Sequence, residues 1–408
     1  MTLILGIETS CDETAAAVVA DGRVVRSNVV ASQHELHATY GGVVPEIASR
    51  AHVQRIEPVV RRALDEAGVS AARVDAVAVG NRPGLIGSLL VGVSAAQALA
   101  WALGRPLIGV DHVHAHLYAA ELVPAPPQRG PAAPTPLPSG GAGGGWARAP
   151  DGASTEDRGT AAGHAEAPPT DLPRGGRGSE PGPADEPHYP ALGLVVSGGH
   201  TSLYAVRGPL ELELLGRTID DAVGEAYDKA AVILEAGYPG GPRLDGLAQR
   251  GDGRAHELPR SMLEAGSLDF SFSGLKTALL YAVRGRPVGR GRRASFPRSA
   301  AELTDRQRAD FAASFQEAVV DVLIAKIERA LAHLPEARRV VVGGGVSANS
   351  LLRKRLGELG ERRGVAVNLP ELALCVDNAA MIAGLAHARL EAGQVDGLDL
   401  PAVATGSG

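Results

Sequence analysis

Two stretches of this sequence share one layout, and this repeat constrains the fold more than any other feature. Near the start, the apolar residues 3–8 are followed by a polar turn and by a second apolar run, residues 14–19. Further along, residues 192–196, a polar turn and residues 201–206 follow the same order. Each stretch is typical of two buried strands joined by a turn. Because one such unit opens each half of the chain, we predict two duplicated domains that face each other.

The segment between these units, residues 124–190, differs sharply in composition from the rest. It holds 15 of the 28 prolines and 13 of the 52 glycines, a larger share than the roughly 25–30% that marks low complexity. Such a segment buries too little apolar surface to offset the entropy lost on ordering. We therefore predict a disordered insertion, and we expect a chain lacking residues 128–185 to keep its stability and activity.

Outside this segment, strand-like and helix-like patterns alternate. Apolar side chains recur at helical spacing in residues 47–64 and 311–331, and a predicted helix, residues 88–103, lies between two short apolar runs. The run 340–342 leads into three consecutive glycines. This alternation predicts the α/β class, with sheets covered by helices on both faces.

Composition favours a cytoplasmic protein. No apolar run approaches the roughly 18 residues of a transmembrane helix, and two cysteines give no disulfide framework. The formal net charge of −6 leaves a local basic patch as the means of binding nucleic acid. One candidate is a Gly/Pro-containing stretch, although a solvated loop would read the same way. Its arginines are Arg284, Arg286, Arg290, Arg292, Arg293 and Arg298.

The most pointed motif is Asp-His-Val-His-Ala-His, residues 111–116. If a helix begins here, His112 and His116 lie one turn apart on one face and can share a metal ion. Surface or capping histidines are the alternative. We expect Asp377, at the start of a predicted helix, as the third ligand, although a helix cap would explain it equally well. Two imidazoles and a carboxylate suit Fe(II), with Zn(II) or Mn(II) as alternatives.

Glycine-rich turns form the second theme. They occur at residues 197–199, 239–241 and 343–345, where a backbone without Cβ atoms lets N–H groups approach a phosphate. Any one of them is equally a tight turn, but three together favour a nucleotide site. The sequence has no P-loop, so a P-loop nucleotide site is excluded.

Taken together, these motifs closely resemble the family of bacterial tRNA threonylcarbamoyladenosine synthase catalytic subunits, once described as O-sialoglycoprotein endopeptidases. The resemblance runs in family order from the first residues to about residue 392, with only the insertion and residues 284–299 outside it. The matching stretches are residues 6–14 (GIETSCDET), 37–50, 83–85, 196–201, 219–229, 269–277 (DFSFSGLKT), 343–349 and 377–383.

The resemblance implies an actin/Hsp70-like fold of two domains with a cleft between them. Residues 1–123, completed by residues 377–400, would form the first domain, residues 124–190 the insertion, and residues 191–376 the second domain. It also implies transfer of the threonylcarbamoyl group from threonylcarbamoyl-adenylate to the N6 amine of the adenosine 3′ of the tRNA anticodon, in tRNAs reading codons that begin with A, with release of AMP. A non-catalytic paralogous subunit and a small ATPase are the implied partners, and no membrane is expected.

The same resemblance assigns the site residues. His112, His116 and Asp377 would hold the metal, most consistently Fe(II). Asp12, Glu13 and His200 would line the reaction centre. The adenylate would be held by Val195, Val196, Ser197, Gly198, Gly199, Asp228, Gly241 and Asn349.

Three other functions remain as alternatives. An ATP-dependent kinase or ATPase of the same superfamily would share the glycine turns but would not need the His112/His116/Asp377 set. A non-catalytic relative would be expected to lose that set. A metalloprotease would carry glutamate directly after its first histidine as general base, and Val113 stands there.

Overall fold

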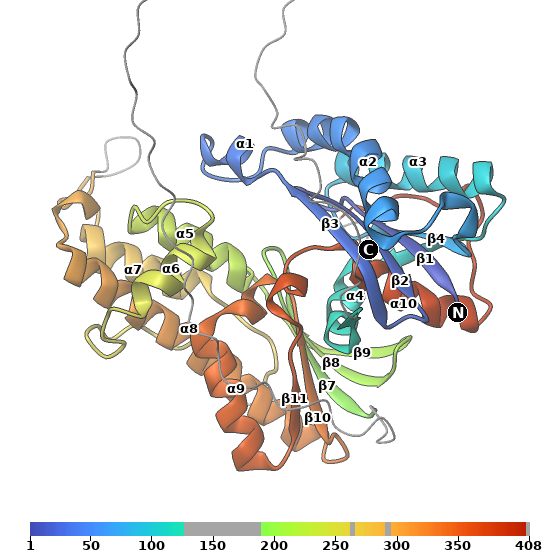
Figure 1. Cartoon of the computed structure of the whole chain (residues 1–408). Coiled ribbons are helices and arrows are strands. Elements are labelled where there is room, and N and C mark those ends of the chain that lie inside the picture. Colours follow the sequence, from blue (N-terminus) through green and yellow to red (C-terminus); the bar gives the residue numbers. More distant parts are fainter. Residues whose placement is uncertain (126–188, 262–265, 290–294, 405–408) are drawn as a thin grey trace, which may run out of the picture. The chain divides into compact units, whose positions relative to one another are not determined.

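The computed structural model describes residues 1–125, 189–261, 266–289 and 295–404 (Figure 1). Within these ranges the chain forms two mixed sheets, each flanked by helices, which confirms the predicted α/β class. The predicted insertion lies almost wholly outside the described residues. The division into domains at residues 123, 190 and 376 stays a prediction.

The first sheet has the strand order β5-β4-β1-β2-β3-β6. Its central strands β1 and β2 pair antiparallel, and β1 pairs parallel with β4. The strands are β1 (Leu3–Glu8), β2 (Glu13–Ala20), β3 (Val24–Ser32), β4 (Ala76–Arg82), β5 (Leu107–Asp111) and β6 (Val123–Pro124). The accompanying helices are α1 (His34–Ala38), α2 (Pro45–Ala67), η1 (Ala71–Arg73), α3 (Ile86–Leu103), α4 (His112–Tyr118), η2 (Ala119–Glu121) and α10 (Ala379–Glu391).

The second sheet has the order β11-β10-β7-β8-β9. As in the first sheet, its opening strands β7 and β8 form an antiparallel pair, and β7 pairs parallel with a later strand, β10. The strands are β7 (Ala191–Val196), β8 (Thr201–Gly208), β9 (Glu211–Arg217), β10 (Arg339–Gly343) and β11 (Ala366–Asn368). The helices are α5 (Val223–Ile233), α6 (Gly240–Ala248), α7 (Ser273–Arg284), η4 (Ala300–Glu302), α8 (Asp305–His333), η5 (Gly345–Ala348), α9 (Ser350–Arg363) and η6 (Leu372–Leu374).

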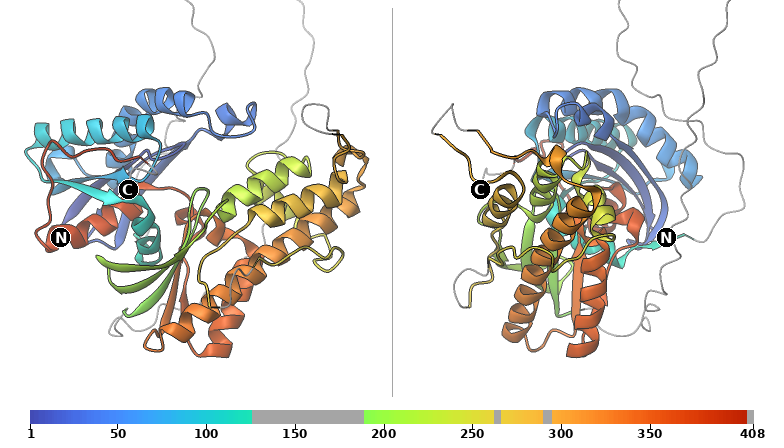
Figure 2. Two further views of the ribbon diagram at one scale, coloured as in Figure 1. Left: turned by 180° about the vertical axis from the view of Figure 1, so that it is seen from behind. Right: turned by 90° about the vertical axis from the view of Figure 1, so that its left-hand side faces the viewer.

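Alternation along the strands explains how both faces of the first sheet are covered. In a strand, successive side chains point to opposite faces, and every residue of β1 and β2 is buried. One set, including Ile4, Ala15 and Ala17, packs with α10 in one core. The other face is covered by α2 and α3, which contact β2 and β4 (Figure 2).

Among the described residues, helix α3 is long and apolar enough to cross a membrane. Its mean hydropathy is 1.7 over 18 residues. The expectation that no such run exists was wrong, because Gly, Ser and Gln interrupt the apolar residues without lowering their mean much. A core helix meets the same criterion. Leu89 is fully buried, and a Cβ on Gly92 would lie 2.3 Å from Thr9 Oγ1, so this helix packs closely against the turn after β1.

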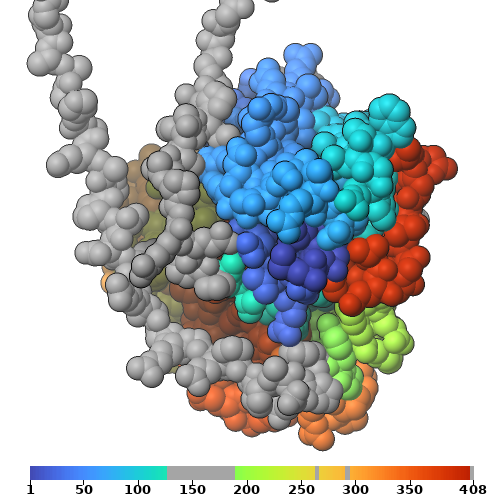
Figure 3. Space-filling model, turned by 45° about the vertical axis from the view of Figure 1, so that its right-hand side comes forward, coloured from blue at the N-terminus to red at the C-terminus, as the bar shows by residue number. Residues whose placement is uncertain are grey.

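The C-terminal part of the described chain lies against the first sheet. A Cβ on Gly6 would lie 2.3 Å from the carbonyl oxygen of Ala379, so β1 and α10 touch through their backbones. Beyond α10, Asp396 accepts from Gly109 N at 2.7 Å, and Pro401 O accepts from Asn81 Nδ2 at 3.0 Å. The C-terminal residues, red in Figure 3, accordingly lie on the surface beside the N-terminal ones, dark blue. Residues 379–391 thus belong structurally with a sheet formed by the first 124 residues.

Candidate metal centre and reaction site

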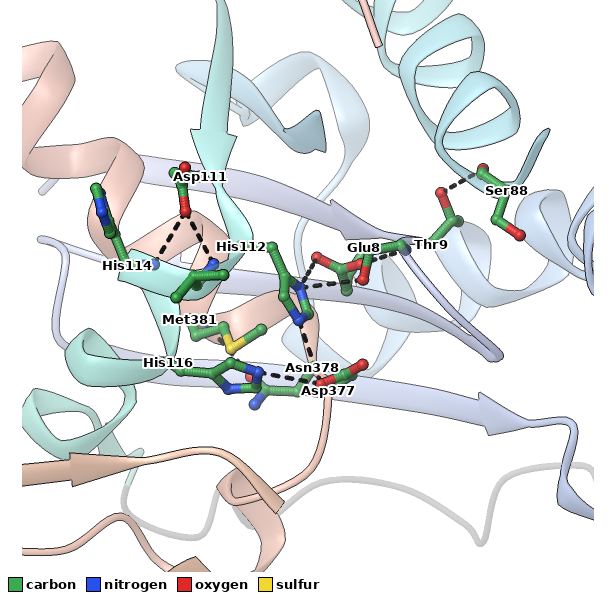
Figure 4. A network of polar contacts seen from close by, with 12 residues as sticks. Glu8, Thr9, Ser88, Asp111, His112, His114, His116, Asp377, Asn378 and Met381 are labelled. Atoms are coloured by element: carbon green, nitrogen blue, oxygen red, sulfur yellow. Dashed lines mark hydrogen bonds and ion pairs between the residues drawn. The ribbon is translucent and has the colours of Figure 1, made fainter. Parts of the chain in front are cut away.

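Helix α4 carries the predicted histidines, and its start is fixed by a side-chain cap. Asp111, the last residue of β5, accepts hydrogen bonds from Val113 N at 3.0 Å and His114 N at 3.1 Å, which satisfies N–H groups that the first turn leaves unpaired. With the helix fixed at residue 112, His112 and His116 lie one turn apart (Figure 4). The predicted spacing is therefore present.

Three faces of this short helix have three different contacts. Ala115, together with Ala119 directly after the helix, packs into the core of the first sheet. Val113 and Leu117 pack into a separate cluster with residues of β7, β8 and β10. The third face carries the two histidines, which are 4% and 0% exposed. The sequence of α4 thus buries both imidazoles where the two sheets approach the same helix.

The backbone of β10 approaches α4 closely at one residue. A Cβ on Gly343 would lie 2.0 Å from the carbonyl oxygen of His116, closer than any side chain permits. This glycine is therefore required for the contact. The sequence predicts the same glycine as part of a phosphate-binding turn.

Asp377 lies where the predicted third ligand should be. Its Oδ1 is 3.5 Å from His112 Nε2 and 3.2 Å from His116 Nε2. The two rings are 4.6 Å apart and nearly perpendicular. Helix α10 is capped instead by the next residue, Asn378, which accepts from Met381 N at 3.0 Å (Figure 4). The capping alternative for Asp377 is therefore wrong, and its carboxylate faces both imidazoles.

The donor atoms of this trio fit a divalent metal. One ligand atom from each of His112, His116 and Asp377 lies within 4.8 Å of the other two, so these residues could hold an ion. Both ring nitrogens of His116 are buried and make no hydrogen bond to any residue that the structure describes, although buried polar atoms normally have partners. Nε2 of His116 faces Asp377 without hydrogen-bond geometry, which suits an ion shared by the two groups.

Glu8, at the end of β1, orients His112 from the other side. Its Oε2 is 3.0 Å from His112 Nδ1, and Ser10 Oγ is 3.1 Å from the same nitrogen. A carboxylate on the second nitrogen of a metal-binding imidazole fixes the tautomer and directs Nε2 toward the metal. Sequence reasoning missed Glu8, because an acidic residue at the end of an apolar strand gives no signal of its partner 104 residues away.

The charges of this cluster shift its pKa values strongly. Although burial opposes it, the Glu8 and Asp377 carboxylates raise the pKa of His112 well above its usual value. Burial lowers the pKa of His116. For His200, burial with the charges of His112 and His116 lowers the pKa to about 4. His200 is therefore neutral near pH 7. It lies close enough to His112 and His116 for their charges to change its pKa.

A second cluster joins the predicted Asp12 and Glu13 to a residue that sequence reasoning missed, His34 of α1. His34 Nε2 lies 3.2 Å from Glu13 Oε1 and 3.9 Å from Asp12 Oδ2. The His34 ring packs edge-on against Tyr238 at 5.8 Å. Burial raises the pKa of Glu13 to about 8, with His34 acting in the opposite direction and Asp12 adding to the rise. This cluster therefore holds a proton on an acid near neutral pH.

Two of the three glycine turns lie side by side. A Cβ on Gly344 would lie 2.5 Å from Val196 O, so the turn after β10 contacts the end of β7. Val195 and Val196 are buried strand residues. A Cβ on Gly198 or Gly199 would meet no atom within 4 Å, so the backbone of this turn is open. The two turns meet as a phosphate-binding surface would require.

The remaining predicted binding residues differ in whether they are free to contact a ligand. Asp228 Oδ1 accepts from Gly240 N at 2.9 Å, next to the open Gly241. The Asn349 side chain is already engaged, because it caps α9 through Leu352 N and donates to Gln316 Oε1 at 2.8 Å. Its direct contact with an adenylate stays a prediction.

Comparison with known proteins gives the family. The family model of tRNA N6-adenosine threonylcarbamoyltransferase matches residues 24–143 and 179–384. This chain belongs to that family. A transferase of this name from Symbiobacterium thermophilum is 46% identical over 98% of this chain and 95% of its own length. One from Trichlorobacter lovleyi is 46% identical over 99% of this chain and 96% of its own.

Solved structures of lower identity share only the fold. HypF from T. kodakarensis is 15% identical, with a TM-score of 0.51 over 96% of this chain and 48% of its own. A full-length HypF in a phosphate- and nucleotide-bound form is 12% identical, with the same TM-score over 97% of this chain and 47% of its own. Together with the two sheets of matching topology, the comparisons confirm the expected actin/Hsp70-like fold of this transferase family.

Proposed function

We propose that this chain transfers a threonylcarbamoyl group from threonylcarbamoyl-adenylate to the N6 amine of the adenosine 3′ of the anticodon, in tRNAs reading codons that begin with A. Near full-length similarity to transferases of this name supports the reaction. The observation that carries the chemistry is the convergence of His112, His116 and Asp377 on one point. No family or relative named above is a kinase, so the kinase alternative has no support.

The residues divide into three roles. His112, His116 and Asp377 would hold one divalent metal, for which Fe(II) is our assignment from the ligand set. When bound, such an ion polarises a carbonyl oxygen or orients a phosphate. The open turns at Gly198, Gly199 and Gly241, beside Asp228, would hold the adenylate through backbone N–H groups. His200, neutral through burial, would donate or accept a hydrogen bond without adding charge.

The Asp12–Glu13 pair would remove the proton. The adenosine nitrogen forms a bond to the carbonyl carbon, the bond from that carbon to the AMP phosphate oxygen breaks, and AMP leaves with the bonding electrons. The amine proton passes to a carboxylate of the pair. A general base works best when its pKa lies near the working pH. Glu13, with a pKa of about 8, would accept the proton in its ionised form, whose share grows as the pH rises toward 8.

The partners and location follow as proposals from the reaction. We infer a cytoplasmic location, because the proposed substrates are tRNA and an adenylate. We infer a non-catalytic paralogous subunit and a small ATPase as partner proteins, on family resemblance alone.

The test uses purified chain, partner subunits, adenylate and tRNA, followed by nucleoside analysis with and without a chelator. We expect modified adenosine that disappears with chelator and returns with Fe(II). Asp377→Ala should lose bound metal, measured by elemental analysis, and lose modification by at least 100-fold. His333→Ala, at the exposed end of α8, is the matched control and should keep both. Metal-free Asp377→Ala with full modification would refute the metal role and leave the transfer itself standing.

A further inference from the structure

A hollow of ≈ 480 Å³ lies on the outer face of α6. Three arginines line it, Arg243, Arg250 and Arg308, with Glu235 as the one carboxylate. Glu235 also lies 3.9 Å from Arg284. The lining is thus strongly positive, on a chain whose formal net charge is −6.

Arg243 and Arg250 point outward because the opposite face of α6 is buried. Leu244 and Ala248 are in the core of the second sheet, and Asp245 accepts from Ser350 Oγ at 2.7 Å. Residues three or four apart share one face of a helix. Arg243 and Arg250 therefore lie on the exposed face or just beyond it, as their exposure shows.

No described carboxylate forms an ion pair with these three arginines. Among the described residues, Arg243 and Arg250 find no partner for a side-chain hydrogen bond or ion pair. Arg308 is held by backbone carbonyls, those of Leu234 and Ala300 among them, which fixes its position while leaving its charge unpaired. The hollow therefore combines one fixed and two adaptable guanidinium groups, the groups best suited to phosphates.

The basic stretch suggested by the sequence is a weaker candidate. Arg298 donates to the carbonyl oxygens of Tyr281 and Ala282, and Arg284 lies beside Glu235. Arg290, Arg292 and Arg293 lie outside the described residues. Among the described residues of this stretch, Arg286 alone is exposed without a hydrogen bond or ion pair, whereas the hollow holds both Arg243 and Arg250.

Helix α6 begins at the proposed reaction site. Gly240, its first residue, donates to Asp228. Tyr238, two residues earlier, packs against His34, which pairs with Glu13. Arg243 follows Gly240 by three residues, a rise of about 4.5 Å along the helix. An anion in the hollow is therefore within a few nucleotide lengths of the carboxylates.

We propose that this hollow binds backbone phosphates of the tRNA next to the target adenosine. The proposal rests on the proposed function, which supplies a polyanionic substrate whose base must reach Asp12 and Glu13. Phosphate contacts position a nucleic acid without reading its sequence. The hollow would accordingly fix the anticodon arm relative to the reaction site and leave the choice of base to other contacts.

The test compares Arg243→Glu/Arg250→Glu with Arg73→Glu/Arg338→Glu, in which two exposed arginines elsewhere are reversed. Binding of unmodified tRNA transcript is measured against salt concentration in the full complex. Losing two phosphate contacts should lower the slope of log K against log salt by about 1.4 to 1.8. Affinity near 0.15 M salt should fall by roughly 10-fold or more for the α6 variant and less than about 3-fold for the control.

Further measurements separate the alternatives. Arg243→Gln/Arg250→Gln, which removes charge without reversing it, should show an intermediate loss, and its melting temperature tests folding. Titration with AMP should give wild-type affinity in each variant; a selective loss there would make the hollow a nucleotide site and overturn the proposal. Unchanged tRNA affinity and salt slope in the glutamate variant would overturn it too. A wild-type complex that neither binds nor modifies tRNA would instead refute the proposed function.

Discussion

Replacing Glu13 by glutamine isolates the electrostatic consequence of burying this carboxyl group. The pKa of Glu13 is raised from 4.5 to about 8, so the folded chain holds a proton that the unfolded chain releases above pH 4.5. Folding is then favoured at low pH, and stability falls as the pH rises from 4.5 through 8. Each unit of pKa difference corresponds to about 1.4 kcal/mol of unfolding free energy. The rise of the Glu13 pKa therefore implies that the free energy of unfolding falls by on the order of 4–5 kcal/mol over this pH range. Glutamine, which cannot ionise, should escape this loss.

The assay is denaturant unfolding of wild type and Glu13→Gln at several pH values from 5 to 9, with chelator present. We expect the unfolding free energy of Glu13→Gln, relative to that of wild type, to increase by about 3–5 kcal/mol from pH 5 to pH 9. A change in the protonation of His34, which interacts with Glu13, would reduce this increase. Glu57→Gln, which changes a 65% exposed carboxylate on α2, should give a difference that stays within about 0.5 kcal/mol. A flat difference for Glu13→Gln up to pH 9 would show that water reaches this carboxyl group.

Three further substitutions probe the packing around the site. Gly343→Ala should destabilise the chain by several kcal/mol, because its Cβ would lie 2.0 Å from His116 O. Gly345→Ala, whose Cβ would meet no atom within 4 Å, should change stability by less than about 1 kcal/mol. Thermal unfolding compares the two variants. Leu89→Ala, on the buried face of α3, should cost about 2–5 kcal/mol and Leu90→Ala, half exposed, under about 1 kcal/mol, and equal effects in denaturant unfolding would contradict the packing of α3. Glu8→Gln should weaken metal binding by about 10–100-fold, measured by competition with a chelating dye, because it removes the carboxylate from His112 Nδ1; unchanged affinity would deny Glu8 that role.

Local patterns were sufficient to predict much of the fold. The strand–turn–strand units at residues 3–19 and 192–206 appear as β1–β2 and β7–β8, because uninterrupted apolar runs next to polar turns have few other solutions. Strands β9 and β11 were missed. β9 carries mostly exposed residues, and β11 has only three, so neither has a periodic apolar pattern.

At the site, the sequence was sufficient to predict the metal-binding residues but not the side chains that contact them. His112 and His116 were recognisable from their spacing alone, whereas Asp377 had an equal claim as a helix cap until the structure gave that role to Asn378. Glu8 and His34 could not be found, because their importance lies in partners distant in the chain, His112 and Glu13 respectively. Such pairings are decided by tertiary packing, which one sequence does not display.

The long separation between the two histidines of α4 and Asp377 affects when the trio can form. All of the second sheet is encoded between them. At a synthesis rate of about 5–20 residues per second, the carboxylate emerges from the ribosome on the order of tens of seconds after the imidazoles. During that interval this trio offers an ion two imidazole nitrogens without the carboxylate, so an ion held by all three groups would report that residue 377 has been translated.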